Sequence, residues 1–485
     1  MNQRKADGKA VVGSESAEIN TADRLEEEYH ENKMGTMPLN KLLVTTSLPM
    51  VISMLVQALY NIVDSIFVSR INEAALTALS YAFSLQNLMI AIVAGTGVGV
   101  TALLSKSLGE KNQKLVDRTA NNTLVLYLLT YVVFLILGFT ISHWFFAVQT
   151  DDAQIIEYGT EYMTICMVFS FGMCFQFCFE RLLMATGRTV YTMITQTTGA
   201  VINIIFDPLL IFGIGPFPKM GVRGAAAATV LGQIVAAILA FIFNHKFNHD
   251  VHFHFVDMKL SGAVVGRIYR VGVPSIIMSA ISSVMVIGMN QILRRFTETA
   301  VAVFGVYFKL QSFVFMPIFG MNNGMVPIVA YNYGARRKKR IDGTVHLAMM
   351  YAFLIMVVGL ILFETIPGPL LSIFDASATM KQIGIPALRI IAIHFPIAAF
   401  SIILSSTFQA LGNGVYSLIV SLARQLFALV PIAYLLSLTG NINMVWLSYP
   451  IAEVISLTIS LLFMRRVRKT KLNFKDAGEA VPAKS

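Results

Sequence analysis

The stretch LLVTTSLPMVISMLVQALYNIVDSIFVSR, residues 42–70, decides the fold class. Residues 42–60 contain no charged side chain, and a helix of roughly 20 apolar residues is long enough to cross a bilayer. The run therefore predicts a membrane span. Asp64 follows in the same stretch, where a carboxylate at the centre of a span costs about 2.5–3.5 kcal/mol. A position that costs so much calls for a functional or structural reason.

Composition extends this interpretation to the whole chain. Of its 485 residues, 56% are hydrophobic and 13% are charged, and the mean hydropathy is +0.68; soluble domains carry about 25% charged residues. The apolar runs do not alternate in polarity as the strands of a membrane barrel would. We therefore predict an all-α integral membrane protein with twelve spans, near residues 42–66, 76–104, 120–146, 159–186, 189–213, 222–244, 267–293, 299–330, 344–366, 383–411, 415–438 and 444–464.

The polar segments divide the chain into five parts. We expect a disordered tail at 1–40, a six-helix lobe at 41–245, a hydrophilic linker at 246–266, a second six-helix lobe at 267–465 and a basic tail at 466–485. Lys and Arg gather in alternate loops and in the last tail, so the positive-inside rule predicts that both termini lie in the cytoplasm. We expect the protein to be located in the inner (plasma) membrane. The same clustering accounts for the net charge of +10 without a nucleic-acid partner.

The chain repeats itself at an offset of 225 residues. The shift superimposes unusual residues without a gap, among them Pro49 on Pro274, Gln86 on Gln311, Gly95 on Gly320, Gly99 on Gly324, Gly109 on Gly334, Ala185 on Ala410 and Gly187 on Gly412. Because six spans per half is an even number, both halves share one orientation, related by a pseudo-two-fold axis along the membrane normal. Secondary transporters with such parallel repeats move one half against the other.

The two halves differ in their acidic residues. Asp64 falls on Met289 and Asp207 falls on Ile432. An acid needed only to build the six-helix fold should occur in both copies, so this difference favours a functional role, with drift in one copy as the alternative.

Polar residues share helix faces with both acids. Gln57, Asn61 and Asp64 lie one turn apart in the first span, and Gln196, Asn203 and Asp207 share a face of the fifth. Thr229 and Gln233 lie one turn apart in the sixth. Together these side chains predict an oxygen-rich pocket suited to a proton or a sodium ion. The alternative is a polar lock between helices, in which an amide satisfies each acid.

Several motifs resemble the multidrug and toxic compound extrusion (MATE) family over residues 40–465. They are NIVDSIFVSR (61–70), GTGVGVTALLSKSLGEKN (95–112), MATGRT (184–189), NIIFDPLLIFGIG (203–215) with MGVRGAAAATVLGQ (220–233), and MPIFGMNNGMVPIVAYNYGARRKKR (316–340). The resemblance implies two six-helix lobes arranged as a V, a central cavity, and export of cationic, amphipathic compounds in exchange for H⁺ or Na⁺.

The resemblance also implies site residues. Asp64 matches the acid of the first helix, Asn203 and Asp207 match the pair of the fifth, and Ala225 and Thr229 lie where contributors from the sixth helix occur, so any Na⁺ would bind at Asp64, Asn203, Asp207 and Thr229. The NorM-like branch also uses acids in the second lobe. The seventh span offers only Asn290 and Gln291 there, which resembles the DinF-like and MepA-like branch instead.

The remaining polar residues of the spans have weaker assignments. We expect Gln57, Gln196, Gln233, Lys309 and Asn290 to line the substrate cavity. Lys309 would be a second switch or favour anionic substrates, unless it only snorkels to the membrane surface. Glu180 and Arg181 end the fourth span and predict an ion pair at the membrane interface. The three cysteines, all in that span, are expected to pack as small apolar residues.

These observations predict a monomeric transporter, not an enzyme, without a cofactor other than the coupling ion. No glycine loop for ATP phosphates joins a soluble domain. The alternative function is a flippase for lipid-linked saccharides or other polyprenyl lipids, whose cavity should be strongly cationic to hold phosphates. The acids of the first half oppose that alternative, whereas Lys309 and Arg389 in the second half keep it open.

Overall fold

The protein is described here from a computed structural model, which covers residues 32–253, 259–374, 376–474 and 476. All its regular elements in those ranges are helices. In chain order they are α2 (Lys33–Thr36), α3 (Leu39–Ser69), α4 (Glu73–Gly109), α5 (Gln113–Thr140), α6 (Ser142–Ala147), α7 (Ala153–Val168), α8 (Phe171–Ala185), α9 (Thr189–Phe212), α10 (Val222–Phe247), α11 (Gly262–Arg294), α12 (Glu298–Gly334), α13 (Lys338–Thr365), α14 (Pro367–Ser372), α15 (Ala378–Ala392), α16 (Phe395–Ala410), α17 (Gly414–Leu422), the π-helix η2 (Ala423–Leu429), α18 (Val430–Ser437), α19 (Ile442–Trp446) and α20 (Ser448–Thr470).

These helices form twelve membrane spans, as the sequence predicts. Ten helices or helix runs in the described ranges are long and apolar enough to cross a bilayer. The other two spans are broken: α7 and α8 meet at 46°, and α15 and α16 meet at 50°. Residues 153–185 and 378–410 are counterparts at the 225-residue offset. The repeat therefore preserves even the bend.

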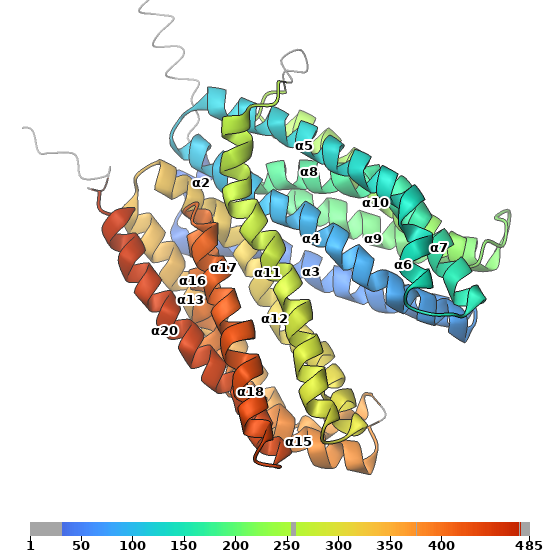
Figure 1. The fold of residues 1–485 in the computed structure, drawn as a ribbon. Helices are drawn as coiled ribbons and strands as arrows, with labels where there is room; N and C mark the ends of the chain where they lie inside the picture. Colours follow the sequence, from blue (N-terminus) through green and yellow to red (C-terminus); the bar gives the residue numbers. More distant parts are fainter. Residues whose placement is uncertain (1–31, 254–258, 375, 475, 477–485) are drawn as a thin grey trace, which may run out of the picture.

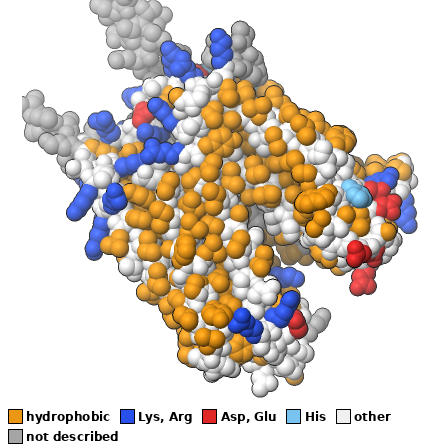
Figure 2. Space-filling view, in the orientation of Figure 1, with side chains coloured by type: hydrophobic (Ala, Val, Ile, Leu, Met, Phe, Trp, Pro, Cys, Tyr) orange, Lys and Arg blue, Asp and Glu red, His pale blue; other side chains and the backbone are white. Residues whose placement is uncertain are grey.

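The spans form two lobes that meet at one end and diverge towards the other, like the arms of a V (Figure 1). The N-lobe holds α3–α10 and the C-lobe holds α11–α20. Both ends of the described chain lie at the end where the lobes meet, which we call the closed end (Figure 1). Figure 2 shows hydrophobic side chains over the flanks of both lobes and many Lys and Arg side chains at the closed end. Apolar flanks with a charged end are what a bilayer requires.

Repeated glycines make the contact between the lobes. Gly95 and Gly99 of α4 press against α11, and their counterparts Gly320 and Gly324 of α12 press against α3. A methyl group at Gly99 would overlap the carbonyl oxygen of Ile268. Small residues let membrane helices approach this closely, so the glycines that reveal the repeat in the sequence also hold the two lobes together.

The closed end has its own glycine contact. A methyl group on Gly109, the last residue of α4, would overlap the carbonyl oxygen of Tyr331 in α12. A methyl group on its counterpart, Gly334, would overlap the carbonyl oxygen of Lys106. The ends of α4 and α12 thus touch around the pseudo-two-fold axis.

Some segments differ from their predicted states. The polar tail was expected to end at residue 40, but the chain is already helical in α2 and again from Leu39, because the C-lobe binds backbone carbonyls of this segment. The predicted states of residues 1–31, 254–258 and 477–485 lie outside the described residues. Cys166, Cys174 and Cys178 are buried and form no disulfide, as the sequence predicts.

Candidate functional site

The polar site of the N-lobe lies where α9 and α10 come unusually close together. Gly199 of α9 and Gly232 of α10 face each other, and a methyl group on either would press on the other's carbonyl oxygen. This approach sets the polar face of α9 directly against Thr229 of α10. The small residues of GAAAATVLGQ (224–233) therefore position the site without contributing chemistry to it.

Asn203 links Asp207 to Thr229. Asp207 is fully buried, and Asn203 and Thr229 are 3% and 8% exposed. With its amide oriented to satisfy its neighbours, Asn203 donates to Oδ2 of Asp207 (3.1 Å) and accepts from the Thr229 hydroxyl (3.1 Å). Ala225, one turn before Thr229, is fully buried and adds no polar atom.

Asp64 reaches this group from α3. Its carboxyl group lies close enough to that of Asp207 for the two acids to interact. Two neighbouring carboxylates repel each other and can only accept hydrogen bonds, so a proton held between them would stabilise the pair. Oδ1 of Asp64 is buried and has no hydrogen-bond partner among residues 32–253, 259–374, 376–474 and 476. The pair can therefore take up another donor or a cation at this oxygen.

A cavity of about 100 Å³ opens beside these residues. Three of the predicted cavity residues, Gln57, Gln196 and Gln233, line it together with Asn203 and Thr229. The rest of its wall is formed by Tyr60, Ile90, Met173, Gln176, Phe177, Gly199, Ala200 and Gly232. Amides, a phenol and apolar side chains thus form a mixed polar and apolar wall beside the acid pair.

Three predicted site residues lie apart from this cavity. Asn61 is exposed on α3, and its backbone carbonyl accepts from Ser65 (2.9 Å). Lys309 and Asn290 belong to the C-lobe. The Lys309 ammonium group lies 5.8 Å from the centroid of the Phe374 ring, a cation–π distance.

The predicted position of Glu180 at the membrane interface is wrong. Instead of forming an ion pair at the membrane interface, it is 1% exposed. Its carboxylate accepts from the Thr195 hydroxyl (2.8 Å) and from the amides of Gln196 (2.8 Å) and Gln176 (3.0 Å). Both glutamines line the cavity, and Gln196 also accepts from Ser53 of α3. Glu180 is thus a third acid beside the N-lobe cavity, tied to α9 by neutral donors.

The C-lobe carries a partly buried ion pair in the corresponding place. Arg424, in the π-helix η2, lies 3.6 Å from the carboxylate of Glu453 in α20. At the repeat offset these residues fall on Gly199 and Ala228 of the N-lobe. Where α9 and α10 leave room for a cavity, the equivalent helices of the C-lobe hold a charged pair.

Comparison with known proteins agrees with this architecture. The family model MatE matches the chain twice, over residues 49–209 and 274–435, which begin 225 residues apart. An FAD transporter of Shewanella oneidensis is 24% identical over 86% of this chain and 92% of its own. Multidrug export protein MepA of Staphylococcus haemolyticus is 23% identical over 88% of this chain and 94% of its own.

Solved structures of similar proteins share the fold. The outward-facing conformation of a multidrug resistance MATE family transporter superimposes with a TM-score of 0.85 at 26% identity, covering 91% of this chain and 98% of that one. A transporter from Pyrococcus furiosus, described as having a binding pocket of reverse polarity, gives a TM-score of 0.81 at 25% identity over 92% and 99%. With both halves of the sequence matched by the family model, the chain belongs to the multidrug and toxic compound extrusion family of membrane transporters.

Proposed function

We propose that this transporter exports cationic, amphipathic compounds in exchange for H⁺ or Na⁺, with coupling through Asp64 and Asp207. The observation that carries the proposal is the fully buried Asp207, bonded to Asn203 beside the N-lobe cavity, with the Asp64 carboxyl group close to it. Their counterparts in the C-lobe, Met289 and Ile432, cannot bind a cation. Coupling is therefore assigned to the N-lobe alone.

The acid pair supports an exchange mechanism. A proton shared by Asp64 and Asp207 leaves the pair with one negative charge, and its loss leaves two charges that repel each other at close range. A sodium ion or the cationic group of a substrate relieves that repulsion, so the proton and the cation compete for one site. Asn203 and Thr229 supply neutral dipoles that adapt to either occupant.

The same helix links the site to the lobe interface. Asp64 lies on α3, and α3 also packs against Gly320 and Gly324 of α12 in the C-lobe. A shift of α3 when Asp64 changes its partner would therefore alter the packing of α3 against α12 at the contact between the lobes. We place the closed end in the cytoplasm, because Lys and Arg gather there.

Two arginines of the C-lobe, Arg389 and Arg424, give no support to anionic substrates. Arg389 donates to the backbone carbonyl of Glu364 (3.1 Å) and lies 3.9 Å from its carboxylate. Arg424 pairs with Glu453. These positive charges are compensated locally, which opposes a phosphate-binding cavity. Since one relative is named as an FAD transporter, FAD is the anionic compound to compare with a cationic drug.

The test is transport by the purified protein in proteoliposomes under an imposed pH or sodium gradient. We expect one gradient to drive a fluorescent cation such as ethidium, and Asp64→Asn or Asp207→Asn to lower that exchange roughly tenfold or more. Asp151→Asn, which changes an exposed acid in the loop before α7, is the matched control.

Other outcomes would point elsewhere. Exchange by Asp64→Asn at the wild-type rate would refute coupling through the pair. Movement of FAD in place of ethidium would refute the substrate class. Movement of a lipid-linked saccharide between leaflets without either gradient would favour a flippase.

A further inference from the structure

We propose that α2 is a latch that holds the closed end of the V shut, and that it must release its contacts with one lobe each time that end opens. The inference rests on the lobes moving against each other, as the proposed exchange requires, but on neither the coupling ion nor the substrate. It assigns a role to the GARRKKR motif (334–340), which the transport site does not use.

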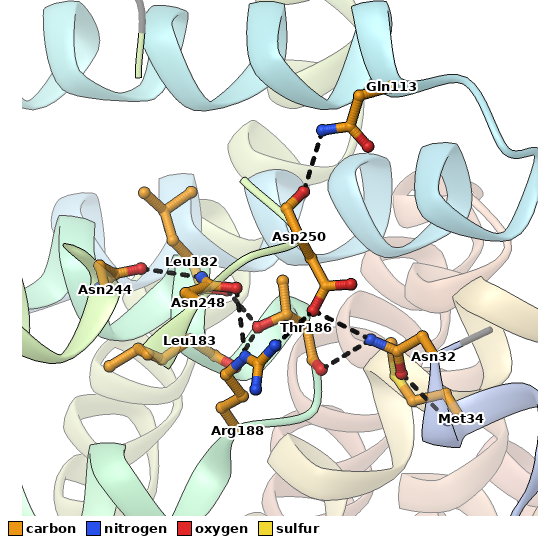
Figure 3. Close-up of polar contacts among 10 residues, drawn as sticks. All are labelled: Asn32, Met34, Gln113, Leu182, Leu183, Thr186, Arg188, Asn244, Asn248 and Asp250. Atoms are coloured by element: carbon orange, nitrogen blue, oxygen red, sulfur yellow. Dashed lines mark hydrogen bonds and ion pairs between the residues drawn. The ribbon is translucent and has the colours of Figure 1, made fainter. Parts of the chain in front are cut away.

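The first half of the latch is the attachment of α2 to the N-lobe (Figure 3). The Asn32 amide donates to the carbonyl of Thr186 (3.2 Å) and to Oδ2 of Asp250 (3.3 Å). Asp250 is itself held by Arg188 at 2.8 Å, and its backbone carbonyl accepts from Gln113 (3.1 Å). The start of α2 is thus tied to the loop between α8 and α9 and to the chain that follows α10.

The second half is the attachment of α2 to the C-lobe. Arg340 of α13 donates to the carbonyls of Met34 (3.0 Å) and Met37 (2.8 Å). Arg337 donates to the carbonyl of Gly35 (2.6 Å), and Asn332 of α12 donates to that of Met34 (3.0 Å). Met34 is fully buried. The C-lobe therefore binds the carbonyls at the end of α2, which lack helical partners and carry partial negative charge.

The latch exists in one copy only. At the repeat offset Arg337, Arg340 and Asn332 fall on Asn112, Leu115 and Ser107 of the N-lobe. The donors that grip α2 are thus absent from the other half, although the glycine contacts between the lobes are present in both. An element that the architecture needed for packing would be expected twice. Its single occurrence indicates a device added to the symmetric frame.

Opening the closed end must break one set of these bonds. Because α2 is bonded to both lobes and is only four residues long, it cannot stretch to keep both attachments when the lobes part. Hydrogen bonds from a charged guanidinium are stronger than those between neutral groups. Weakening them should therefore shift the population towards the conformation in which this end is open.

The first experiment measures that population. Spin labels are placed at the exposed positions Lys114 of α5 and Lys469 of α20, in a full-length chain whose three native cysteines are replaced by Ala, reconstituted in liposomes. We expect Arg340→Leu to raise the fraction with a long distance between the labels roughly tenfold. Asn32→Ala should shift it in the same direction. Arg466→Gln removes one exposed charge at the same end and is the matched control.

A reversible covalent link between α2 and the lobes tests the latch within one folded protein, so that a loss of stability in a variant cannot explain the result. Cysteines replace Asn32 and Asp250 on the N-lobe side and Thr36 and Arg340 on the C-lobe side, in a chain without its native cysteines, and each pair is joined by a short reducible cross-linker. With both links in place α2 can release neither lobe, so we expect the linked protein to lose transport and reduction to restore it. Transport by the linked protein at the rate of the reduced protein, or distance distributions of Arg340→Leu and Asn32→Ala that match the wild type, would overturn the latch.

Discussion

Two fully buried acids of the N-lobe differ in what surrounds them. Asp207 meets another carboxyl group and one amide, whereas Glu180 meets three neutral donors and no second acid. A carboxylate that accepts several hydrogen bonds is stabilised in its charged form, while an acid pair exchanges protons and cations. We therefore assign Glu180 a positioning role, since its partners Gln176 and Gln196 form part of the cavity wall.

This assignment predicts a stability effect at position 180. Glu180→Ala would leave the side-chain amides of Gln176 and Gln196 without their acceptor in a partly buried place, and an unsatisfied buried donor costs about 1–3 kcal/mol. Thermal unfolding in detergent should show the loss as a lower Tm. Glu180→Gln keeps an acceptor oxygen and should fall between Ala and the wild type. An unchanged Tm for Glu180→Ala would contradict the network.

The sequence could locate the acid pair but not the role of Glu180. Asn203 and Asp207 are one turn apart on α9, so helical spacing alone places them on one face, and the structure brings both to Asp64 and Thr229. Glu180 lies near the end of its span beside Arg181, which favoured an ion pair at the interface. Its partners lie on another turn and another helix, and spacing cannot predict such contacts between helices.

At the scale of helices, the glycine contact at the closed end gives a sharp prediction. Gly109→Ala would place a methyl group on the carbonyl oxygen of Tyr331 in the other lobe. Backbone atoms cannot move aside as a flexible side chain does, so the ends of α4 and α12 must separate. We expect a Tm lower than that of the wild type and more rapid labelling of a cysteine introduced at this end.

Gly305→Ala is the matched control for that change. Gly305 also lies within α12, but a methyl group there would meet no atom within 4 Å. Alanine forms helices better than glycine by about 1 kcal/mol, so this variant should be as stable as the wild type or more so. Equal Tm values for Gly109→Ala and Gly305→Ala would show that α4 and α12 can accommodate a methyl group at Gly109, which would contradict a tight contact between the lobes there.

The partly buried pair of Arg424 and Glu453 in the C-lobe leads to a prediction about paired changes. Glu453 is 3% exposed, and removing it alone leaves Arg424, whose side chain is 29% exposed, without its charge partner. The cost should be smaller than the roughly 3–5 kcal/mol of a fully buried pair. Replacing both residues by Met removes the unpaired charge together with the pair. We expect Glu453→Met to lower the Tm and the double variant to recover most of the loss. A double variant that is no more stable than the single one would contradict a simple ion pair.

At this scale the sequence predicts the spans better than their irregularities. Apolar length is enough to find twelve spans, because a bilayer imposes that length on every one of them. The breaks after Val168 and Ala392 and the π-helix η2 depend on packing against neighbouring helices. The helix α2 is short and polar at its start, and its order comes from donors about 300 residues away in the sequence.

For the whole molecule, a group of positive charges at the closed end links the lobe arrangement to pH. Lys471 follows the last span, and its ammonium group donates to the carbonyl of Leu411 (2.8 Å). Burial, with Arg270 and Lys106 nearby, lowers the pKa of Lys471 to about 8. Lys106 belongs to the N-lobe and the other two residues to the C-lobe. Separation of the lobes at this end would therefore move Lys106 away from Lys471 and remove part of what lowers its pKa.

The sign of the pH effect follows from proton binding. When the closed end opens, water reaches Lys471 and its pKa rises towards the ordinary value of 10.5, so opening takes up a proton between these two values. Below about pH 8 the lysine is charged in both states and the closed state bears the full cost of its burial. That cost disappears as the pH rises, so alkaline pH favours the closed end staying shut.

The spin-label distance between positions 114 and 469 provides the measurement. Between about pH 7 and pH 9.5 we expect the fraction of wild-type molecules whose lobes are separated at this end to fall several-fold. Lys471→Met removes the titrating group, so its open fraction should be low at both pH values and nearly constant. Asp64→Asn separates this effect from the transport site, because it should leave the alkaline change intact. A pH dependence that persists in Lys471→Met would place the titrating group elsewhere in the molecule.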